Sequence, residues 1–230
     1  MHLCMPGPKI AAMLSLTEEN YLKAIYFISG EEGHLVSTNA IAERLDSRAA
    51  TVTEMLRRLK AKELIEYQPY RGSRLSKEGK SIAISILRKH RLWEAFLVQK
   101  LDFGWEEVHE IAEQLEHIRS PKLTERLAAF LGHPQFDPHG DPIPNAQGVF
   151  PLRDNYTLDK CQAGNVLLVT GVKDSSPDFL TYVAKLGIQL GDELRVLSQE
   201  PFDRSLLLKH GDNEYRLSAL AAANIYVKEK

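Results

Sequence analysis

The sequence has 230 residues, of which 43% are hydrophobic and 26% are charged, a composition typical of a soluble protein with roughly two or three small domains. It contains no apolar run close to the roughly 20 residues that a membrane-spanning helix needs, and its first residues lack the apolar core of a secretory signal. Two cysteines, Cys4 and Cys161, stand too far apart to suggest a disulfide framework or a zinc knuckle. We therefore expect a cytoplasmic protein without membrane contact, preceded by a disordered lead-in over residues 1–13.

The formal net charge of −2 hides an uneven distribution of charge along the chain. Between Arg44 and Arg91 there are 13 Lys and Arg residues against five Asp and Glu residues, so the rest of the chain is acidic. A basic block of this kind favours contact with a polyanion. For any single residue in the block, a solvated helix surface remains the alternative.

The first part of the chain predicts three helices, over residues 16–28, 36–45 and 48–62, followed by a hairpin over residues 64–76. This order is typical of a winged helix-turn-helix DNA-binding domain, which we place at residues 14–77. Small and polar residues at the start of the third helix permit close approach to base edges, and the arginines that follow suit phosphates. The candidate DNA contacts are Ser37, Thr38, Arg48, Ala49, Ala50, Thr51, Thr53, Glu54, Arg57 and Arg71.

Residues 78–145 are predicted to form a helical domain. A long helix begins at Ser76 and continues to about Val98, a second contains His109, and a third covers residues 121–131. These helices are rich in Leu, Ile and Trp and have no basic face. Because helix-turn-helix proteins usually read paired half-sites about one helical turn apart, we interpret them as the platform of a homodimer.

The stretch from Trp105 to His117 is the most informative about chemistry. Four potential ligands fall within roughly 100° of arc on one face of an ideal helix: His109, Glu113, Glu116 and His117. Such groups repel one another and lose hydration when buried, and a divalent cation resolves both problems. His90 and Glu94, spaced i, i+4 on the preceding helix, are placed to supply further ligands. A solvated Glu/His face is the alternative interpretation.

A Pro- and Gly-rich boundary extends from Gly132 to Pro144 and contains Asp137 and His139, which are candidates to share an ion with Glu94. From about Tyr156, short β-branched runs separated by turns predict an SH3-like β-barrel, which we place at residues 155–230. The expected fold class is therefore mainly α with a small β domain.

Taken together, these segments resemble the diphtheria toxin repressor family, metal-dependent regulators of iron and manganese, and most closely its manganese-responsive branch. The resemblance rests on segments in the family's order: Thr17–Tyr26, Ile41–Leu45, Thr51–Val52, Arg88–Leu92, Val108–His117 and Gly132–Pro144. It implies an N-terminal winged helix-turn-helix, a helical metal-binding and dimerisation domain, and a C-terminal SH3-like (FeoA-like) domain.

The family's principal metal site, carried onto this sequence, falls on Asn20, His90, Glu113, Glu116 and His117. The manganese branch resembles this pattern at Glu113, whereas the iron branch has Cys there. Asn20 departs from both branches, which have Asp or Met at that place. Lys23 stands where some manganese-only members have a Glu that helps to bind a second ion, which argues against a binuclear cluster.

The family's second site, carried over in the same way, falls on Glu94, Asp137 and His139, with an acid from the C-terminal domain, either Asp174 or Asp178. In the iron branch the second site uses His109 instead. An oxygen-rich set of ligands without a thiolate favours Mn²⁺, with Fe²⁺ as the alternative and Zn²⁺ or Co²⁺ as further metals in vitro.

The resemblance implies a repressor of metal-ion homeostasis that is not an enzyme and that binds double-stranded operator DNA as a dimer when loaded with metal. Two alternatives from other classes stay open. One is a metal-dependent hydrolase that uses the Glu/His site, for which the sequence offers no base or nucleophile motif. The other is a winged-helix regulator that senses a non-metal ligand, with the Glu/His stripe as a solvated face.

Overall fold

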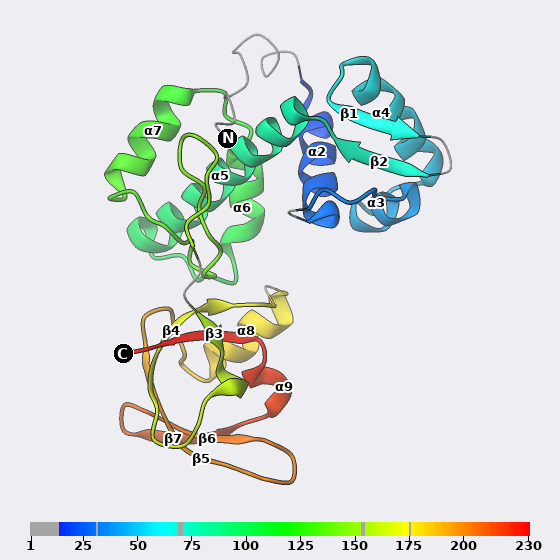
Figure 1. The fold of residues 1–230 in the computed structure, drawn as a ribbon. Coiled ribbons are helices and arrows are strands. Elements are labelled where there is room, and N and C mark those ends of the chain that lie inside the picture. The colour runs from blue at the N-terminus through cyan, green and yellow to red at the C-terminus, as the bar shows by residue number, and fades with distance from the viewer. Residues whose placement is uncertain (1–13, 31, 69–70, 153–154, 175) are drawn as a thin grey trace. The chain divides into compact units, whose positions relative to one another are not determined.

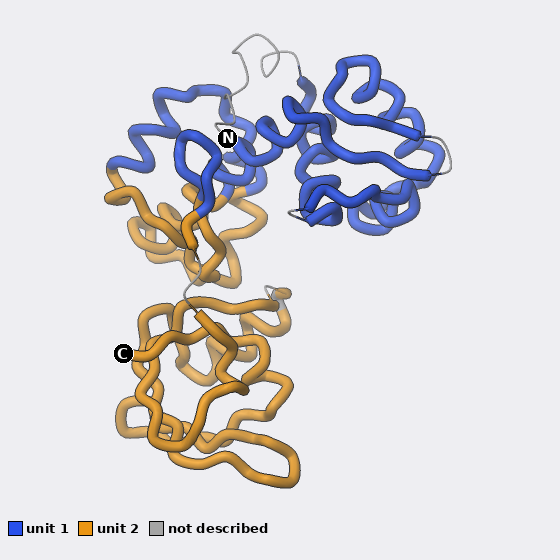
Figure 2. The backbone as a smooth tube through the Cα atoms, viewed as in Figure 1, with its two compact units in different colours: residues 1–90, 113–129, 144–150 blue, residues 91–112, 130–143, 151–230 orange. Residues whose placement is uncertain are grey.

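The computed structural model describes residues 14–30, 32–68, 71–152, 155–174 and 176–230 (Figure 1). The expected lead-in over residues 1–13 lies outside this range. Two compact units can be distinguished in the chain (Figure 2). The first unit contains residues 1–90, 113–129 and 144–150, and the second contains residues 91–112, 130–143 and 151–230. The boundary between His90 and Arg91 falls within the long helix α5, Lys77–Leu101.

Helix α2, Leu16–Ser29, opens the first unit and begins with a capping box between Ser15 and Glu18. The Ser15 side chain accepts a hydrogen bond from the Glu18 backbone N–H, and the Glu18 carboxylate accepts one from the Ser15 backbone N–H. These bonds satisfy donors that the first turn of a helix leaves without partners. Leu22 and Ile25, both fully buried, join α2 to the core of the DNA-binding part.

The winged helix-turn-helix consists of α3, Thr38–Arg44, and α4, Ala49–Ala61, followed by strands β1, Ile65–Gln68, and β2, Gly72–Leu75. The apolar residues of α4 fall on one face of the helix and are fully buried: Val52, Leu56 and Leu59. The two strands pair antiparallel, and Ser73 bridges back to Val36. The predicted fold of this part is confirmed.

The rest of the helical part consists of α5, α6, Val108–Leu115, and α7, Pro121–Phe130. The sequence predicted one helix through His117, but α6 ends at Leu115. The backbone N–H of Ile118 donates to the carbonyl of Leu115, which closes a turn instead of continuing the helix. Glu116 and His117 therefore lie in that turn, and the prediction of one helical stripe holding all four ligands was wrong.

The C-terminal part of the second unit is a six-stranded antiparallel sheet in the order β3-β8-β4-β5-β6-β7. Its strands and helices are β3 Tyr156–Thr157, the 3₁₀ helix η1 Leu158–Lys160, β4 Val166–Val172, α8 Pro177–Lys185, β5 Glu193–Gln199, β6 Leu206–His210, β7 Asn213–Leu217, α9 Ala219–Ala222 and β8 Ile225–Glu229. The sheet encloses a core of buried aliphatic residues, to which Trp105 also belongs. None of the helices in the described ranges combines the length and the apolar character that a membrane crossing needs.

Candidate metal centre

Glu116 lies at the centre of the candidate site in the first unit, and its side chain is fully buried. Lys23 reaches it from α2, with Nζ 2.7 Å from Glu116 Oε1 and 2.9 Å from Oε2. The same ammonium lies 3.2 Å from Glu113 Oε1. From α5, His90 Nδ1 lies 2.7 Å from Glu116 Oε2. A buried carboxylate is costly unless it is paired, and here both of its oxygens are.

These partners also decide the protonation state of Glu116. Burial alone raises the pKa of a carboxyl group because it disfavours the charged form. In Glu116 the hydrogen bond from His90 and the positive charge of Lys23 outweigh burial and hold the pKa below its ordinary value. The carboxylate is therefore ionised at neutral pH, which is the form that binds a metal.

His117 is oriented by a second acidic residue of α2. Its Nδ1 lies 2.6 Å from Glu19 Oε2, and Glu19 is buried. This hydrogen bond leaves Nε2 on the other side of the ring, 3.7 Å from Glu116 Oε1. A histidine that donates one ring N–H to a carboxylate and presents the other nitrogen is the usual arrangement of a metal ligand.

The sequence interpretation missed Glu19, although a signal was present. Glu19 stands three residues before the fully buried Leu22 and therefore on the buried side of α2. A carboxylate in that position needs a partner.

Asn20 gives a direct test of whether a cation fits this site. Its Oδ1 is buried and accepts no hydrogen bond within the described part of the chain. Buried polar atoms are seldom left without a partner, so an orphaned oxygen on the helix that carries Glu19 and Lys23 suits a cation. The donor types of Asn20, His90, Glu113, Glu116 and His117, oxygen and imidazole without thiolate, fit Mn²⁺ or Fe²⁺. Lys23 is the one member of the cluster that does not fit.

A separate group of potential ligands occupies the second unit. Glu94, Asp137 and His139 are all buried, and each offers a ligand atom within 4.8 Å of the others. His139 Nε2 donates to the backbone carbonyl of Trp105 at 2.7 Å, so its Nδ1 faces Glu94, whose Oε2 lies 3.8 Å away. The carbonyl of Trp105 thus fixes which imidazole nitrogen is available to an ion.

In this second group, the pKa values of Asp137 and His139 both lie well above the ordinary values of these side chains. Burial raises the pKa of Asp137 to about 7, with help from the negative charges of Glu94 and Asp141. Burial lowers the pKa of His139, but the hydrogen bond and charge of Glu94 and the charge of Asp137 outweigh it and raise the pKa to about 9. A metal bound here displaces protons from both groups, because ligands bind in their deprotonated forms.

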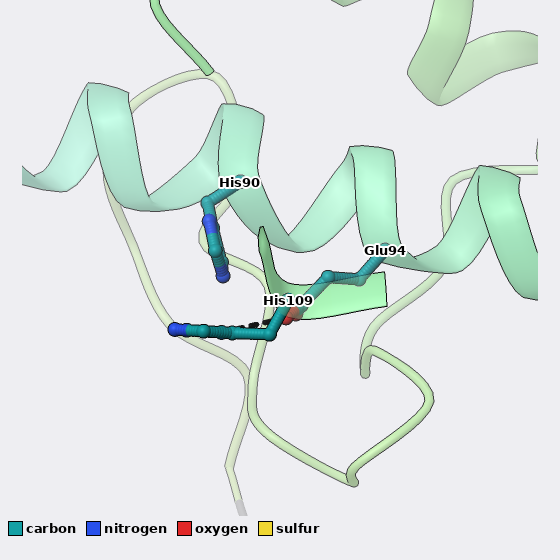
Figure 3. Close-up of side chains that lie close together, drawn as sticks. All are labelled: His90, Glu94 and His109. Carbon is teal, nitrogen blue, oxygen red and sulfur yellow. Dashed lines mark hydrogen bonds and ion pairs between the residues drawn. The ribbon is translucent and has the colours of Figure 1, made fainter. Parts of the chain in front are cut away.

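His109 contacts the second group through Glu94 and offers a ligand atom within 4.8 Å of ligand atoms of His90 and Glu94. Its Nδ1 lies 3.3 Å from Glu94 Oε1, and His90 stands one helical turn before Glu94 on α5 (Figure 3). Whether His109 shares an ion with Glu113, Glu116 and His117 stays a prediction.

The sheet domain reaches the second group through its backbone and not through Asp174. Asp174 is exposed, and its Oδ1 accepts a hydrogen bond at 2.9 Å from the backbone N–H of Ser176, the residue that caps α8. It is not among the clustered ligand atoms of the described residues. By contrast, the backbone carbonyl of His139 accepts a hydrogen bond from the backbone N–H of Val172 at 2.7 Å. This bond attaches the loop that contains Asp137 and His139, the ligand loop, to β4.

The DNA candidates lie on the helix-turn-helix of the first unit, and most are exposed: Ser37, Arg48, Ala49, Ala50, Thr51, Glu54, Arg57 and Arg71. Thr38 and Thr53 are half-buried. Some of these side chains already have intramolecular partners. Thr53 Oγ1 donates to the carbonyl of Ala49 at 2.9 Å, and Glu54 pairs with Arg58 at 2.5 Å. Their contacts with DNA stay a prediction.

The fold and the two ligand groups define a winged-helix DNA-binding protein with a helical metal-binding part and a small C-terminal β domain. Family models match all three parts. They are the iron dependent repressor N-terminal DNA binding domain over residues 13–73, the iron dependent repressor metal binding and dimerisation domain over residues 76–145, and the FeoA domain over residues 156–229.

Individual relatives agree with these matches. The diphtheria toxin repressor of Corynebacterium efficiens is 35% identical over 194 residues, which cover 80% of this chain and 84% of that protein. The iron-dependent repressor IdeR of Mycobacterium tuberculosis is 39% identical over 128 residues, 56% of this chain and 55% of that protein. The match therefore spans about half the length of the IdeR relatives.

Solved structures extend the likeness to nearly the whole chain. A manganese-dependent transcriptional repressor in complex with manganese is 36% identical, with a TM-score of 0.74, and the match covers 93% of this chain and 100% of that one. ScaR with bound Cd²⁺ is 33% identical, with a TM-score of 0.68, and the match covers 93% and 99% of the two chains. This chain belongs to the iron-dependent repressor family, which includes the diphtheria toxin repressor.

Proposed function

We propose that this chain is a metal-responsive transcriptional repressor that binds double-stranded operator DNA as a homodimer when it holds Mn²⁺, with Fe²⁺ as the alternative metal. Its family membership, its winged helix and its basic block between Arg44 and Arg91 support the DNA-binding part of the proposal. The relatives described as manganese-dependent, together with Glu113 in place of a thiolate, support Mn²⁺. We place the protein in the cytoplasm, where operator DNA is accessible.

One observation carries the proposal: α2 belongs both to the core of the winged helix and to the candidate metal centre. Leu22 and Ile25 pack it into the core of the winged helix. On the adjoining part of the same helix, Glu19 contacts His117 and Lys23 contacts Glu116. The position of α2, and of α4 packed in the same core, therefore depends on what happens at the candidate metal centre.

In the proposed metal-bound state, Asn20, His90, Glu113, Glu116 and His117 hold the ion. The ion supplies positive charge that neutralises the carboxylates and ties α2 to the segment 113–117. Glu19 orients the His117 ring, and the core of the winged helix transmits the position of α2 to α4. A coupling of about 1–3 kcal/mol, or roughly 5–150-fold in DNA affinity, is ordinary for such a link.

We further propose that Glu94, Asp137 and His139, with His109 beside them, form a second metal site in the second unit. Their burial and their clustering support it. Asp174 is left out of this set, because its exposed carboxylate accepts a hydrogen bond from the backbone N–H of Ser176.

The proposal is tested by fluorescence anisotropy with duplex DNA taken from upstream of the gene, in Mn²⁺, in Fe²⁺ under anaerobic conditions and in chelator. Wild-type protein is expected to bind tightly with metal and weakly, with strong salt dependence, without it. Glu113→Ala and His117→Ala should lose only the metal-dependent part. Arg57→Ala is the matched control, expected to weaken DNA binding at every metal concentration while the affinity for Mn²⁺ stays unchanged.

Three results contradict the proposal. The first is Mn²⁺-dependent DNA binding by Glu113→Ala at the metal concentration that serves the wild type. The second is metal-dependent hydrolysis of phosphoesters or peptides by the wild type, absent from Glu113→Ala, which supports a hydrolase instead. Titration calorimetry without a saturable Mn²⁺ site supports a regulator that senses a non-metal ligand.

A further inference from the structure

We propose that Lys23 is a tethered cation that occupies the principal metal centre in the metal-free protein and must withdraw before a divalent ion binds there. This inference rests on the proposed function of that centre. It adds Lys23 as the residue that raises the Mn²⁺ concentration needed to fill the site. If Lys23 acts in this way, the measured affinity of the site for Mn²⁺ is lower than the intrinsic affinity of its ligands. The difference is the free energy needed to displace the Lys23 ammonium.

The first support is the geometry of the Lys23 ammonium. Nζ lies within 2.9 Å of both carboxylate oxygens of Glu116 and 3.2 Å from Glu113 Oε1. These are the same oxygens that would bind an ion. An ion bound to these oxygens would therefore lie within a few ångströms of the ammonium and compete with it for them.

The second support is burial. The side chain of Lys23 is 11% exposed and that of Glu116 is 0% exposed. A lysine is seldom buried to this degree unless it is paired, and a buried carboxylate left alone is strongly unfavourable. The pair therefore stabilises the metal-free state, and any ion that takes Glu116 must overcome that stabilisation.

The third support is the charge of the two competitors. An ammonium and a divalent cation repel each other, and the repulsion is large at the few ångströms available in a site shielded from water. Withdrawal of Lys23 is feasible because the charge sits on a flexible four-carbon stem.

In the metal-free protein, Lys23 itself links α2 to the end of α6. Lys23 already ties α2 to Glu113 and Glu116, which lie on and just after α6, with one positive charge where Mn²⁺ brings two. The metal-free protein is therefore expected to keep its α2 contact instead of releasing it, and metal replaces a weaker link with a stronger one.

The test compares Lys23→Met with Lys62→Met in the full-length protein. Methionine keeps the length and apolar stem of lysine and removes the charge. Lys62 is a matched control, because it also forms an ion pair with a buried glutamate of α2, Glu18 at 2.7 Å, and Glu18 is not a proposed ligand. Two quantities are measured: Mn²⁺ affinity by titration calorimetry, and the midpoint of thermal unfolding in chelator.

For Lys23→Met we expect Mn²⁺ to bind at least about tenfold more tightly, which corresponds to ~1.4 kcal/mol, together with a lower unfolding midpoint in chelator. For Lys62→Met we expect a lower midpoint and no change in Mn²⁺ affinity. If Lys23→Met is too unstable in chelator, Lys23→Gln refolded in Mn²⁺ and titrated by competition with a chelator gives the same comparison.

Unchanged or weaker Mn²⁺ affinity in both Lys23 variants overturns the inference, and it then leaves Lys23 as a structural ion-pair partner. That result is distinguishable from failure of the proposed function, which shows as a wild-type protein whose DNA binding does not respond to metal. Tighter Mn²⁺ binding by Lys23→Met supports the inference whatever the DNA result.

Discussion

The imidazole of His117 is hydrogen-bonded to the carboxylate of Glu19, with Nδ1 2.6 Å from Oε2. Because Glu19 fixes the ring and its tautomer, Glu19→Ala is expected to weaken Mn²⁺ binding by about 10–100-fold, the usual cost of losing a residue that orients a ligand. Titration calorimetry measures it, with Glu18→Ala as the neighbouring control, since Glu18 pairs with Lys62 instead. Equal Mn²⁺ affinity in the wild type and Glu19→Ala would show that this hydrogen bond has no part in binding metal.

At the proposed metal centre, Asn20 offers a neutral amide oxygen, whereas an aspartate at this position would offer a charged carboxylate oxygen. Asn20→Asp is expected to tighten Mn²⁺ binding on the order of tenfold, because the affinity of oxygen sites follows the number of charged ligands. Asn20→Ala removes the orphaned Oδ1 and should weaken binding by a similar factor. A competition titration with a metal-sensitive dye measures both. Two variants with the same affinity as the wild type would place Asn20 outside the coordination sphere.

Gly140 and Gly171 meet backbone to backbone where the ligand loop contacts β4. A Cβ added to Gly140 would lie 2.2 Å from Thr170 O, and one added to Gly171 would lie 2.4 Å from His139 O. Both residues have positive φ, +81° and +151°. Gly171→Ala is therefore expected to cost about 1–3 kcal/mol through overpacking. It should also displace His139 and weaken metal binding at the second group.

Gly164→Ala is the control for this prediction. Gly164 has φ +96°, and a Cβ there meets nothing within 4 Å, so backbone strain acts without a steric clash. Urea unfolding gives the free energy of unfolding of both variants. If Gly164→Ala and Gly171→Ala lose the same stability and keep the same metal stoichiometry, the close contact has no role of its own.

The ion pair of Glu18 and Lys62 makes the metal-free protein sensitive to acid. Burial alone would raise the pKa of Glu18, but Lys62 and the Ser15 backbone N–H hold it below its ordinary value of 4.5. The folded state therefore binds this proton less tightly than the unfolded chain. The stability contributed by the pair is present above pH 4.5 and is lost as the pH falls through the lowered pKa.

Lys62→Met should accordingly destabilise the chelated protein at neutral pH by about 0.2–1 kcal/mol, the range for a partly exposed ion pair. The difference from the wild type should shrink as the pH falls below 4.5. Denaturant unfolding across this pH range measures it. Arg58→Met, which removes the exposed pair with Glu54, should give a smaller difference, and a larger one would assign the effect to surface charge in general.

Much of the local structure could be predicted from the sequence. The helix periods, the hairpin between β1 and β2, and the change to short β-branched runs near Tyr156 depend on neighbouring residues only, and the predicted elements appear close to their expected bounds. Elements with weaker local signals were missed, among them β7, Asn213–Leu217, and α9, Ala219–Ala222.

The sequence by itself also determined the kinds of ligand available: carboxylates, imidazoles and one amide, without a thiolate near them. Only the tertiary structure decided which of them meet. It ended α6 before Glu116, turned His109 toward Glu94, placed Glu19 against His117, and brought the Lys23 ammonium between two carboxylates. The physical reason is that spacing along a helix fixes which face a side chain occupies, whereas its partner comes from a segment distant in sequence.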